Sequence, residues 1–497
     1  MRDRRLRAHT LIRIQQNRNP HLFVGGLDVE AEGSATLVVT SPADGTTVGR
    51  IPTANARDVD KAVISARKVQ RDHWQQVGPA ERARLLWRLS DALEEEANDL
   101  AIFESLQTGK TFRDVLSHDI APSIEILRYY AGWIDKHCGE HIDLGRGQTG
   151  DVTWEGPAVV AAVLPQHDPF AAAVRKSAVA LAVGASIIIK PPERAPLTVL
   201  QLAAIMNRIG FPPGSVNVLT GQTATEEAMA SHPDITSMTY SGPIDQARRM
   251  LVGAAKSNLK PVHFELGGKS SAVLFEDGPI TRATQAICAS IFRSRCTHGA
   301  AAAHLLVHER IYESVCSAIT ARAREIILGD PLDEHTELGP MTDEDHLKRV
   351  LAYVELGRRE GATVVAGGNR DVEGPRSMGC YVKPSVLVQT TPAMRVTRED
   401  INGPVLCISR FRHEDEVVEA LNAADYGTAA SLWTNDLTRG RRLARRLDVG
   451  TVWINAHDTS MPGLPQAGRR LSGLGRDLGR AALMQTALPK SILVDTR

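Results

Sequence analysis

The sequence predicts an α/β protein with more than one domain, and three observations support this prediction. The chain has 497 residues, more than a single hydrophobic core usually holds. Short apolar stretches alternate with runs at helical spacing along most of its length, a pattern typical of βαβ units. Its composition, 43% hydrophobic and 23% charged residues, is that of an ordinary globular protein.

The first elements of this pattern are helical. Residues 56–70 carry apolar side chains at helical spacing, and residues 80–106 continue as a long amphipathic helix. Ahead of them, residues 1–21 are rich in arginine but lack the apolar stretch and cleavage site of a secretory signal. We expect this segment to be a frayed basic tail, with an interaction arm as the alternative.

Two α/β series follow. In the first, predicted strands alternate with predicted helices, so their strands should be parallel. The strands are expected at 158–165, 186–192, 215–221 and 235–242, and the helices at 171–184, 196–209 and 223–231. The second series has a helix at 279–293, a strand at 304–308, a helix at 310–328, and strands near 382–389 and 404–411.

A smaller sheet is predicted from two distant segments. The stretch "HIDLGRGQTGDVTW" near residues 140–155 reads as two strands joined by a Gly-rich turn. The last strand, "KSILVDT", is isolated at the end of the chain and needs a partner. We expect an intersubunit sheet there, because an unpaired strand edge exposes a row of hydrogen-bonding groups.

Charge and cysteine content restrict the possible partners. The chain has 58 basic and 58 acidic residues, which does not favour nucleic acid or an anionic membrane as the main partner. No apolar run approaches the roughly 20 residues of a membrane helix. The six cysteines are scattered without paired spacing, so we expect reduced thiols and a cytoplasmic location.

Nine stretches, in this order and at matching spacing, resemble the aldehyde dehydrogenase family from about residue 22 to the C-terminus. They are "HLFVGG", "ESLQTGKTFRDV", "LRYYAGWIDK", "IIIKPPERAPLT", "GFPPGSVNVLTG", "HFELGGKSSAVLF", "INGPVL", "GTVWIN" and "RRLSGLGRDLG". The resemblance implies a Rossmann-like NAD-binding domain, an α/β catalytic domain, a small oligomerisation sheet, and a homodimer or homotetramer. The NAD-binding domain would comprise residues 22–136 and 157–262, and the catalytic domain residues 263–460. The oligomerisation strands would lie at residues 137–156 and 480–497.

The resemblance also implies a dinucleotide site. Lys190 and Glu193 occupy the positions that the family places beside the adenosine ribose, and a carboxylate there favours NAD over NADP. Ser241 and Gly242 match the turn where the pyrophosphate approaches a helix N-terminus. Ala247 replaces the second glycine of that turn, and its methyl group is expected to narrow the approach of the cofactor. Without the other stretches, a surface Lys/Glu pair would be the default interpretation.

The catalytic half departs from the family pattern. The family mechanism uses a cysteine thiolate, an oxyanion-binding asparagine and a glutamate that activates water. Glu265 matches that glutamate and Lys176 is retained, but His167 in "PQHDP" stands in the place of the asparagine. Asp400 and Asn402 replace a glutamate and an aromatic residue beside the nicotinamide.

The nucleophile position itself holds a glycine. Spacing from Glu265 and from the strand ending "LLV" both lead to Gly299. Placing Cys296 there requires a deletion on one side and a compensating insertion on the other. We therefore expect Cys296 to be a packed, unreactive thiol. Asp477 falls in the "GRD" stretch, where a second acidic residue is expected.

Three functions remain open. The first is an NAD-binding oxidoreductase that acts on a small aldehyde or related carbonyl compound without a thioester, with His167 and Glu265 transferring protons. The second is a catalytically inactive relative with a structural, regulatory or NAD-responsive role. The third is ordinary aldehyde oxidation through Cys296. A metal site built from Cys296, His298 and His167 is a weaker alternative, and we predict no bound metal.

Overall fold

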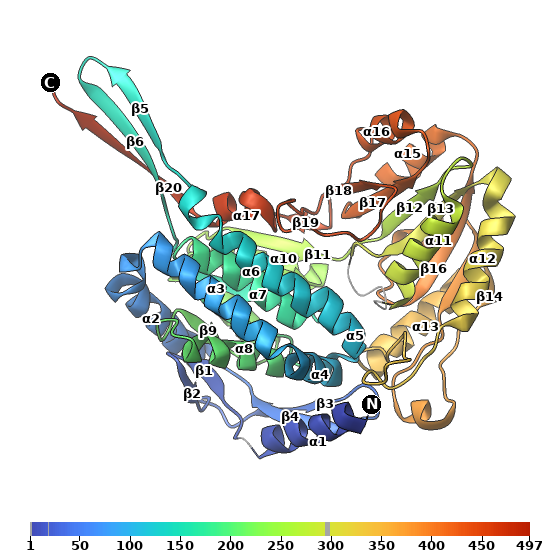
Figure 1. The fold of residues 1–497 in the computed structure, drawn as a ribbon, viewed down its shortest axis with the longest axis horizontal. Coiled ribbons are helices and arrows are strands. Elements are labelled where there is room, and N and C mark those ends of the chain that lie inside the picture. The colour runs from blue at the N-terminus through green and yellow to red at the C-terminus, as the bar shows by residue number, and fades with distance from the viewer. Residues whose placement is uncertain (1, 18, 294–298) are drawn as a thin grey trace.

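Two α/β cores and a projecting three-stranded sheet make up the protein (Figure 1). The computed structural model describes residues 2–17, 19–293 and 299–497. In this part of the chain, no helix is both long and apolar enough to cross a membrane.

The first core is built on an eight-stranded sheet with the order β19-β11-β10-β7-β8-β9-β1-β2. The adjacent strands β11, β10, β7, β8 and β9 run parallel, and the alternating pattern predicted the last four of them. Strands β7, β8 and β9 are buried on both faces, which explains their uninterrupted apolar sequences. The strands are β1 (Leu22–Val24), β2 (Leu27–Val29), β7 (Val159–Val163), β8 (Ser186–Lys190), β9 (Val216–Val218), β10 (Ser237–Gly242), β11 (Val262–Leu266) and β19 (Gly473–Leu474).

Helices cover both faces of this sheet (Figure 1). The helix α7 is buried along almost its whole length, because it lies between the sheet and the outer helices. The single long helix expected at 80–106 is instead two helices, since Glu96 leaves the helical conformation between them. The helices are α2 (Ala56–Asp72), α3 (Pro79–Glu95), α4 (Ala97–Thr108), α5 (Phe112–Asp114), α6 (Ala121–Ala131), α7 (Pro169–Ala182), α8 (Leu197–Arg208), α9 (Thr223–Ser231) and α10 (Ile244–Lys256).

The N-terminal segment is a packed helix and not the frayed tail that its composition led us to expect. Helix α1 (Arg2–Gln16) lies against α4 and against the hairpin of β3 (Thr36–Thr40) and β4 (Thr47–Pro52). Ala8 is buried in the core, and Arg7 Nε donates to Asp99 Oδ1 at 2.8 Å. The guanidinium of Arg4 lies 4.4 Å from the centre of the Phe112 ring. Tertiary contacts of the arginines therefore fix this helix.

The second core is a seven-stranded sheet with the order β14-β15-β16-β13-β12-β17-β18, parallel except at the β14 edge. Its strands are β12 (Ser270–Leu274), β13 (Ala302–His308), β14 (Thr363–Ala366), β15 (Ser385–Thr390), β16 (Val405–Phe411), β17 (Ala429–Trp433) and β18 (Thr451–Ile454). Its helices are α11 (Ile280–Cys288), α12 (Tyr312–Glu325), α13 (Glu344–Arg359), α14 (Arg395–Arg398), α15 (Glu414–Asn422) and α16 (Leu437–Ala444).

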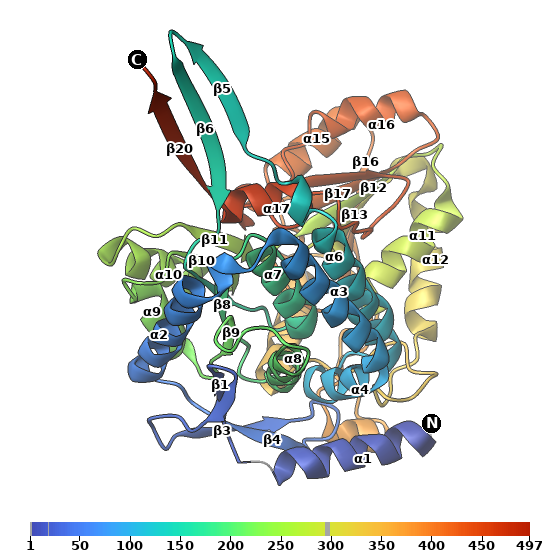
Figure 2. The same cartoon turned by 60° about the vertical axis from the view of Figure 1, so that its left-hand side comes forward.

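The third sheet projects from the body as an arm (Figures 1 and 2). It pairs β20 (Leu488–Asp495) with β6 (Gln148–Glu155), and β6 with β5 (Glu140–Gly145), all antiparallel. Helix α17 (Gly479–Thr486) leads into β20. The two predicted strands and the partner of the terminal strand are thus found within one chain. The pairing of this sheet with a second subunit stays a prediction.

Candidate active site

A cavity of about 1770 Å³ lies between the two large cores and is lined by residues of both. This volume exceeds the roughly 300–1,000 Å³ of a site for one drug-sized molecule, so a large cofactor and a small substrate fit together. The carboxyl ends of β7, β8 and β10 open into it, the usual ligand-binding edge of a parallel α/β sheet. Two π-helical turns, Val115–Ile120 and Ala289–Arg293, also border it.

Glu265 lies on the cavity wall in β11. The parallel register places it beside Ser241 of β10, whose hydroxyl donates to Glu265 Oε2 at 2.9 Å. His263 and Thr239, two residues earlier on the same strands, also line the cavity. The period of two residues along each strand therefore directs four polar side chains toward one space.

Lys176 connects Glu265 to a second acid. It projects from α7 and is buried, and its ammonium group contacts Glu265 Oε1 as well as Asp477 Oδ2, the latter at 3.1 Å. Burial disfavours the charged form of Lys176, but Asp477 and Glu265 outweigh it and raise the pKa of this lysine. Burial likewise opposes ionisation of Asp477, but the charges of Lys176 and Arg175 hold its pKa below the ordinary range. Lys176 and Asp477 are therefore a charged pair.

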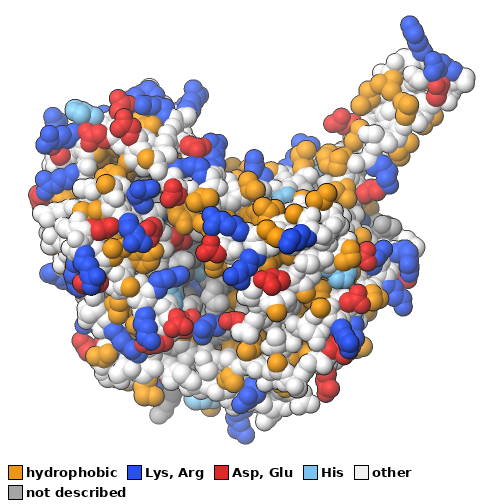
Figure 3. Space-filling view, turned by 180° about the vertical axis from the view of Figure 1, so that it is seen from behind, with side chains coloured by type: hydrophobic (Ala, Val, Ile, Leu, Met, Phe, Trp, Pro, Cys, Tyr) orange, Lys and Arg blue, Asp and Glu red, His pale blue; other side chains and the backbone are white. Residues whose placement is uncertain are grey.

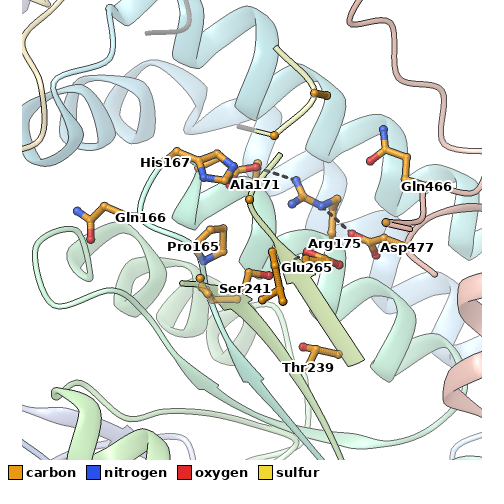
Figure 4. Close-up of a pocket in the computed structure, with 18 of the residues that line it drawn as sticks. Pro165, Gln166, His167, Ala171, Arg175, Thr239, Ser241, Glu265, Gln466 and Asp477 are labelled. Carbon is orange, nitrogen blue, oxygen red and sulfur yellow. Dashed lines mark hydrogen bonds and ion pairs between the residues drawn. The ribbon is translucent and has the colours of Figure 1, made fainter. Parts of the chain in front are cut away.

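His167 is joined to the same group through two further residues. His167 Nε2 lies 3.0 Å from Asp168 Oδ1, and Asp168 Oδ2 accepts from Arg175 at 3.0 Å. Arg175 Nε then donates to Asp477 Oδ2 at 3.2 Å (Figure 4). We call the series His167, Asp168, Arg175, Asp477, Lys176 and Glu265 the ion-pair chain. Acidic and basic side chains alternate from Asp168 to Glu265, and the two end residues, His167 and Glu265, both line the cavity.

Asp168 anchors the histidine end of the ion-pair chain. It is the N-cap residue of α7, so the start of that helix fixes its position. Burial opposes its ionisation, but His167 and Arg175 outweigh this effect and place its pKa well below the usual range for a carboxyl group. Asp168 is thus a fixed negative charge that orients His167.

Gly299 lines the cavity together with Ala300. Its carbonyl accepts from Ser270 Oγ at 2.6 Å, and a Cβ atom built on Gly299 would lie 3.0 Å from the Gly268 nitrogen. Close packing against the Gly267–Gly268 backbone therefore leaves little room for a side chain. The next residue, Ala300, is fixed by a hydrogen bond between its carbonyl and His457 Nε2, at 3.1 Å.

The described cysteines do not supply a nucleophile. Cys296 lies outside the described residues, and so does His298. None of the other five cysteines lines the cavity. Burial raises the pKa of the Cys288 thiol to about 12 and those of Cys316 and Cys380 to about 11. Such thiols stay protonated near neutral pH and are poor nucleophiles.

The predicted cofactor residues line the same cavity. Lys190 ends β8, Glu193 follows it, and Gly242 ends β10 just before helix α10. Ala247 packs instead in the hydrophobic core and is not among the lining residues, so the expected narrowing by its methyl group is absent there.

Asp400 and Asn402 line the cavity near the Gly267–Gly268 backbone. The Asp400 carboxylate accepts the Gly268 N–H at 3.2 Å and the Asn402 N–H at 3.1 Å. Burial raises the pKa of Asp400. The carboxylate thus braces the backbone on which Gly299 packs, a role that the sequence did not predict.

The sequence matches the model of the aldehyde dehydrogenase family over residues 29–492. The chain belongs to this family. A phenylacetaldehyde dehydrogenase of Pseudomonas fluorescens is 36% identical over 96% of both chains. An aldehyde dehydrogenase of Agaricus bisporus is 34% identical over 96% of this chain and 95% of its own.

Solved structures of the aldehyde dehydrogenase family confirm the predicted fold. A Bacillus cereus aldehyde dehydrogenase, solved as an NAD⁺ complex, matches with a TM-score of 0.94 at 34% identity, covering 98% of both chains. Betaine aldehyde dehydrogenase of Staphylococcus aureus, also with NAD⁺, matches with a TM-score of 0.96 at 27% identity over 99% of this chain and 98% of its own. The protein is thus an oxidoreductase of the aldehyde dehydrogenase family by sequence and by fold.

Sequence reasoning missed four residues in this aldehyde dehydrogenase fold. Asp168 and Arg175 complete the ion-pair chain, and Glu226 contacts Lys190 and Gln246 in the cofactor half. The contacts of Arg175 with Asp477 and of Glu226 with its two partners join separate elements, so the only sequence signal was that Asp168 and Arg175 are next to His167 and Lys176. Within the described residues, no group of three His, Cys, Asp or Glu side chains is arranged to hold a metal ion.

Proposed function

We propose that this protein uses NAD to oxidise a small aldehyde or related carbonyl compound without forming a thioester at position 299. The ion-pair chain carries this proposal, because it connects a histidine and a glutamate that line the same cavity as Gly299. Both groups are suited to proton transfer near neutral pH. A glycine has no nucleophilic side chain, so the reaction must proceed without a covalent bond at that residue.

The proposed substrate form is the hydrated aldehyde. Glu265 accepts a proton from water as the water adds to the carbonyl carbon, and then returns this proton to the former carbonyl oxygen, which gives the gem-diol. His167 then accepts a proton from one hydroxyl of the diol while the C–H hydrogen leaves as hydride, and the carboxylic acid forms. Asp168, ionised beside His167, stabilises the resulting imidazolium. NAD, when bound, supplies the hydride acceptor.

Several residues of this chain fit a dinucleotide. The first turn of α10 follows Gly242 and directs backbone N–H groups to the cavity, where they suit a pyrophosphate. Lys190 and Glu193 would bind a ribose, and Asp400 and Asn402 would lie on the nicotinamide side. The Glu193 carboxylate favours NAD over NADP.

One observation favours a non-catalytic role as the second candidate. The Lys176 ammonium group contacts Glu265 directly, so the proposed base is occupied by an ion pair. The other oxygen of Glu265 accepts from Ser241, so both carboxylate oxygens already have partners. If this pairing persists with substrate bound, the protein is an NAD-responsive or structural member of the family.

Turnover by the purified protein tests the proposal. NADH formation and aldehyde consumption are measured across a panel of small aldehydes for wild type, His167→Ala and Cys296→Ala. We expect Cys296→Ala to retain the wild-type rate and His167→Ala to lose roughly 10²- to 10⁴-fold. Loss of activity in Cys296→Ala would show ordinary thioester chemistry, and no turnover by the wild type would support the non-catalytic role.

We also infer that the arm binds a second copy of the chain. Its three strands expose apolar side chains that are visible on the arm in Figure 3. These include Ile142, Leu144, Leu488, Ile492, Leu493 and Val494. An exposed apolar edge of this kind is typical of an interface. Light scattering of the full chain should give a dimer or tetramer, and Leu493→Glu should shift it toward the monomer.

A further inference from the structure

A second lysine–glutamate pair lies in the cofactor half of the cavity. Lys190 Nζ donates to Glu226 Oε1 at 2.6 Å, and both residues are buried. The other carboxylate oxygen of Glu226 accepts from Gln246 Nε2 at 3.2 Å. Both oxygens of Glu226 therefore have partners, and the carboxylate is fixed in place beside the ammonium group.

Three elements converge to build this contact. Lys190 is the last residue of β8, Glu226 lies in the first turn of α9, and Gln246 lies in the first turn of α10. All three residues line the same cavity as Glu193 and Glu265. The contact therefore faces the crevice at the carboxyl ends of the parallel strands, where this type of sheet binds nucleotides.

The contact determines which chemical groups can approach Lys190. An unpaired buried ammonium would attract a phosphate monoester strongly. Here Glu226 neutralises that charge at hydrogen-bond distance, and Glu193 adds a second carboxylate on the same wall. A phosphate would have to displace Glu226 and then lie close to two negative charges, whereas a neutral ribose hydroxyl can donate to either carboxylate.

We propose that Glu226 is a specificity residue that pairs with Lys190 and thereby makes the site reject dinucleotides carrying a 2′-phosphate. This proposal rests on the proposed NAD-binding function and assigns part of its selectivity to a residue outside the Lys190–Glu193 segment. Gln246 is a positioning residue, since it fixes the second oxygen of Glu226.

Charge removal at Glu226 tests the proposal. Glu226→Gln keeps the size and a carbonyl acceptor for Lys190 but removes the negative charge. Glu227→Gln is the matched control, because Glu227 is the next residue, is exposed and does not line the cavity. Dissociation constants of NAD and NADP are measured by calorimetry for all three proteins, together with thermal unfolding.

We expect Glu226→Gln to tighten NADP binding about tenfold or more while NAD affinity changes less than about threefold. Glu227→Gln should leave both affinities unchanged. In a Lys190→Met background the gain from Glu226→Gln should be smaller, since the ammonium that receives the phosphate is gone. The double variant Lys190→Met/Glu226→Gln removes both buried charges together. If Glu226→Gln alone fails to fold, the NADP and NAD affinities of the double variant are compared with those of Lys190→Met.

An unchanged ratio of NADP to NAD affinity in a folded Glu226→Gln protein would overturn the inference while leaving NAD binding intact. An equal gain with and without Lys190 would also overturn it, because the pair would then have no role. Absence of NAD binding to the wild type and to every variant would instead refute the proposed function, and this inference with it.

Discussion

The cavity contains two lysine–glutamate pairs that differ in burial and in partners. In the cofactor half, 5% of the Lys190 side chain and 11% of the Glu226 side chain are exposed, and Glu226 is held by Gln246. In the catalytic half, 37% of the Glu265 side chain is exposed to the cavity, and Lys176 is shared with Asp477. The same two residue types thus form a closed pair, for which we propose exclusion of a phosphate, and a more exposed open pair, for which we propose the role of a base.

The largest expected effect comes from the open pair. Glu265→Gln keeps the size of the side chain but removes the group proposed to accept a proton from water. We expect kcat to fall roughly 10²- to 10⁴-fold, as for the loss of a general base. Steady-state NADH formation measures it, with Glu227→Gln as the exposed control that retains wild-type kcat. A Glu265→Gln enzyme with unchanged kcat would rule out this role.

The next largest effect is a loss of stability in the catalytic half of the cavity, which can be compared with the loss in the cofactor half. Arg175 bridges Asp168 and Asp477, so Arg175→Met leaves two buried carboxylates without their shared cation. We expect the free energy of unfolding to fall by about 3–5 kcal/mol. Denaturant unfolding measures the change. The control is Arg248→Met, because Arg248 pairs with the exposed Asp245 and should change stability by less than about 1 kcal/mol.

Equal losses in the two arginine variants would show that the ion-pair chain does not stabilise the fold. A loss confined to Arg175→Met would instead confirm that the catalytic half depends on a connected set of charges. Lys190→Met gives the comparison for the cofactor half, where one cation serves a single carboxylate.

Local patterns were enough to predict the parallel strands β7, β8, β9 and β10. The resemblance to the family, and not the local pattern, singled out Lys190, Gly242 and Glu265, which all line the cavity. The packing of α1 and the contact of Lys190 with Glu226 could not be predicted. They depend on segments far apart in the sequence, and composition alone indicated only a basic tail at the N-terminus.

A pH-dependent effect of smaller size is expected at His263, on the wall of the catalytic half. Burial, together with the charge of Lys176, lowers the pKa of His263 from 6.5 to about 4. The unfolded chain therefore binds this proton at a higher pH than the folded chain. Stability from this residue is complete above pH 6.5 and is lost as pH falls toward 4, by up to about 3 kcal/mol.

Unfolding free energies of wild type and His263→Gln, measured from pH 7 to about 4, check this expectation. The difference between the two proteins isolates His263 from other titrating groups, such as the buried Glu104, whose raised pKa acts in the opposite direction. A difference that stays constant with pH would mean that His263 titrates normally.

The smallest effect tests the space at Gly299, the position at which we propose that no thioester forms. A Cβ atom there would lie 3.0 Å from the Gly268 nitrogen, closer than ordinary contact, so the backbone must shift by a few tenths of an ångström. We expect Gly299→Ala to cost about 1–2 kcal/mol of unfolding free energy. Gly132→Ala is the control, because its added Cβ would meet neighbours only at 3.5 Å.

The close approach of the Gly267–Gly268 backbone also affects a thiol introduced at position 299. Gly299→Cys should carry a similar stability cost, and its thiol should react with iodoacetamide faster than any thiol of the Cys296→Ala protein, because position 299 faces the cavity. If Gly299→Ala is neutral, the loop accommodates a side chain freely. The glycine would then reflect a lost nucleophile and not a backbone packed too closely against Gly267–Gly268 to accept one.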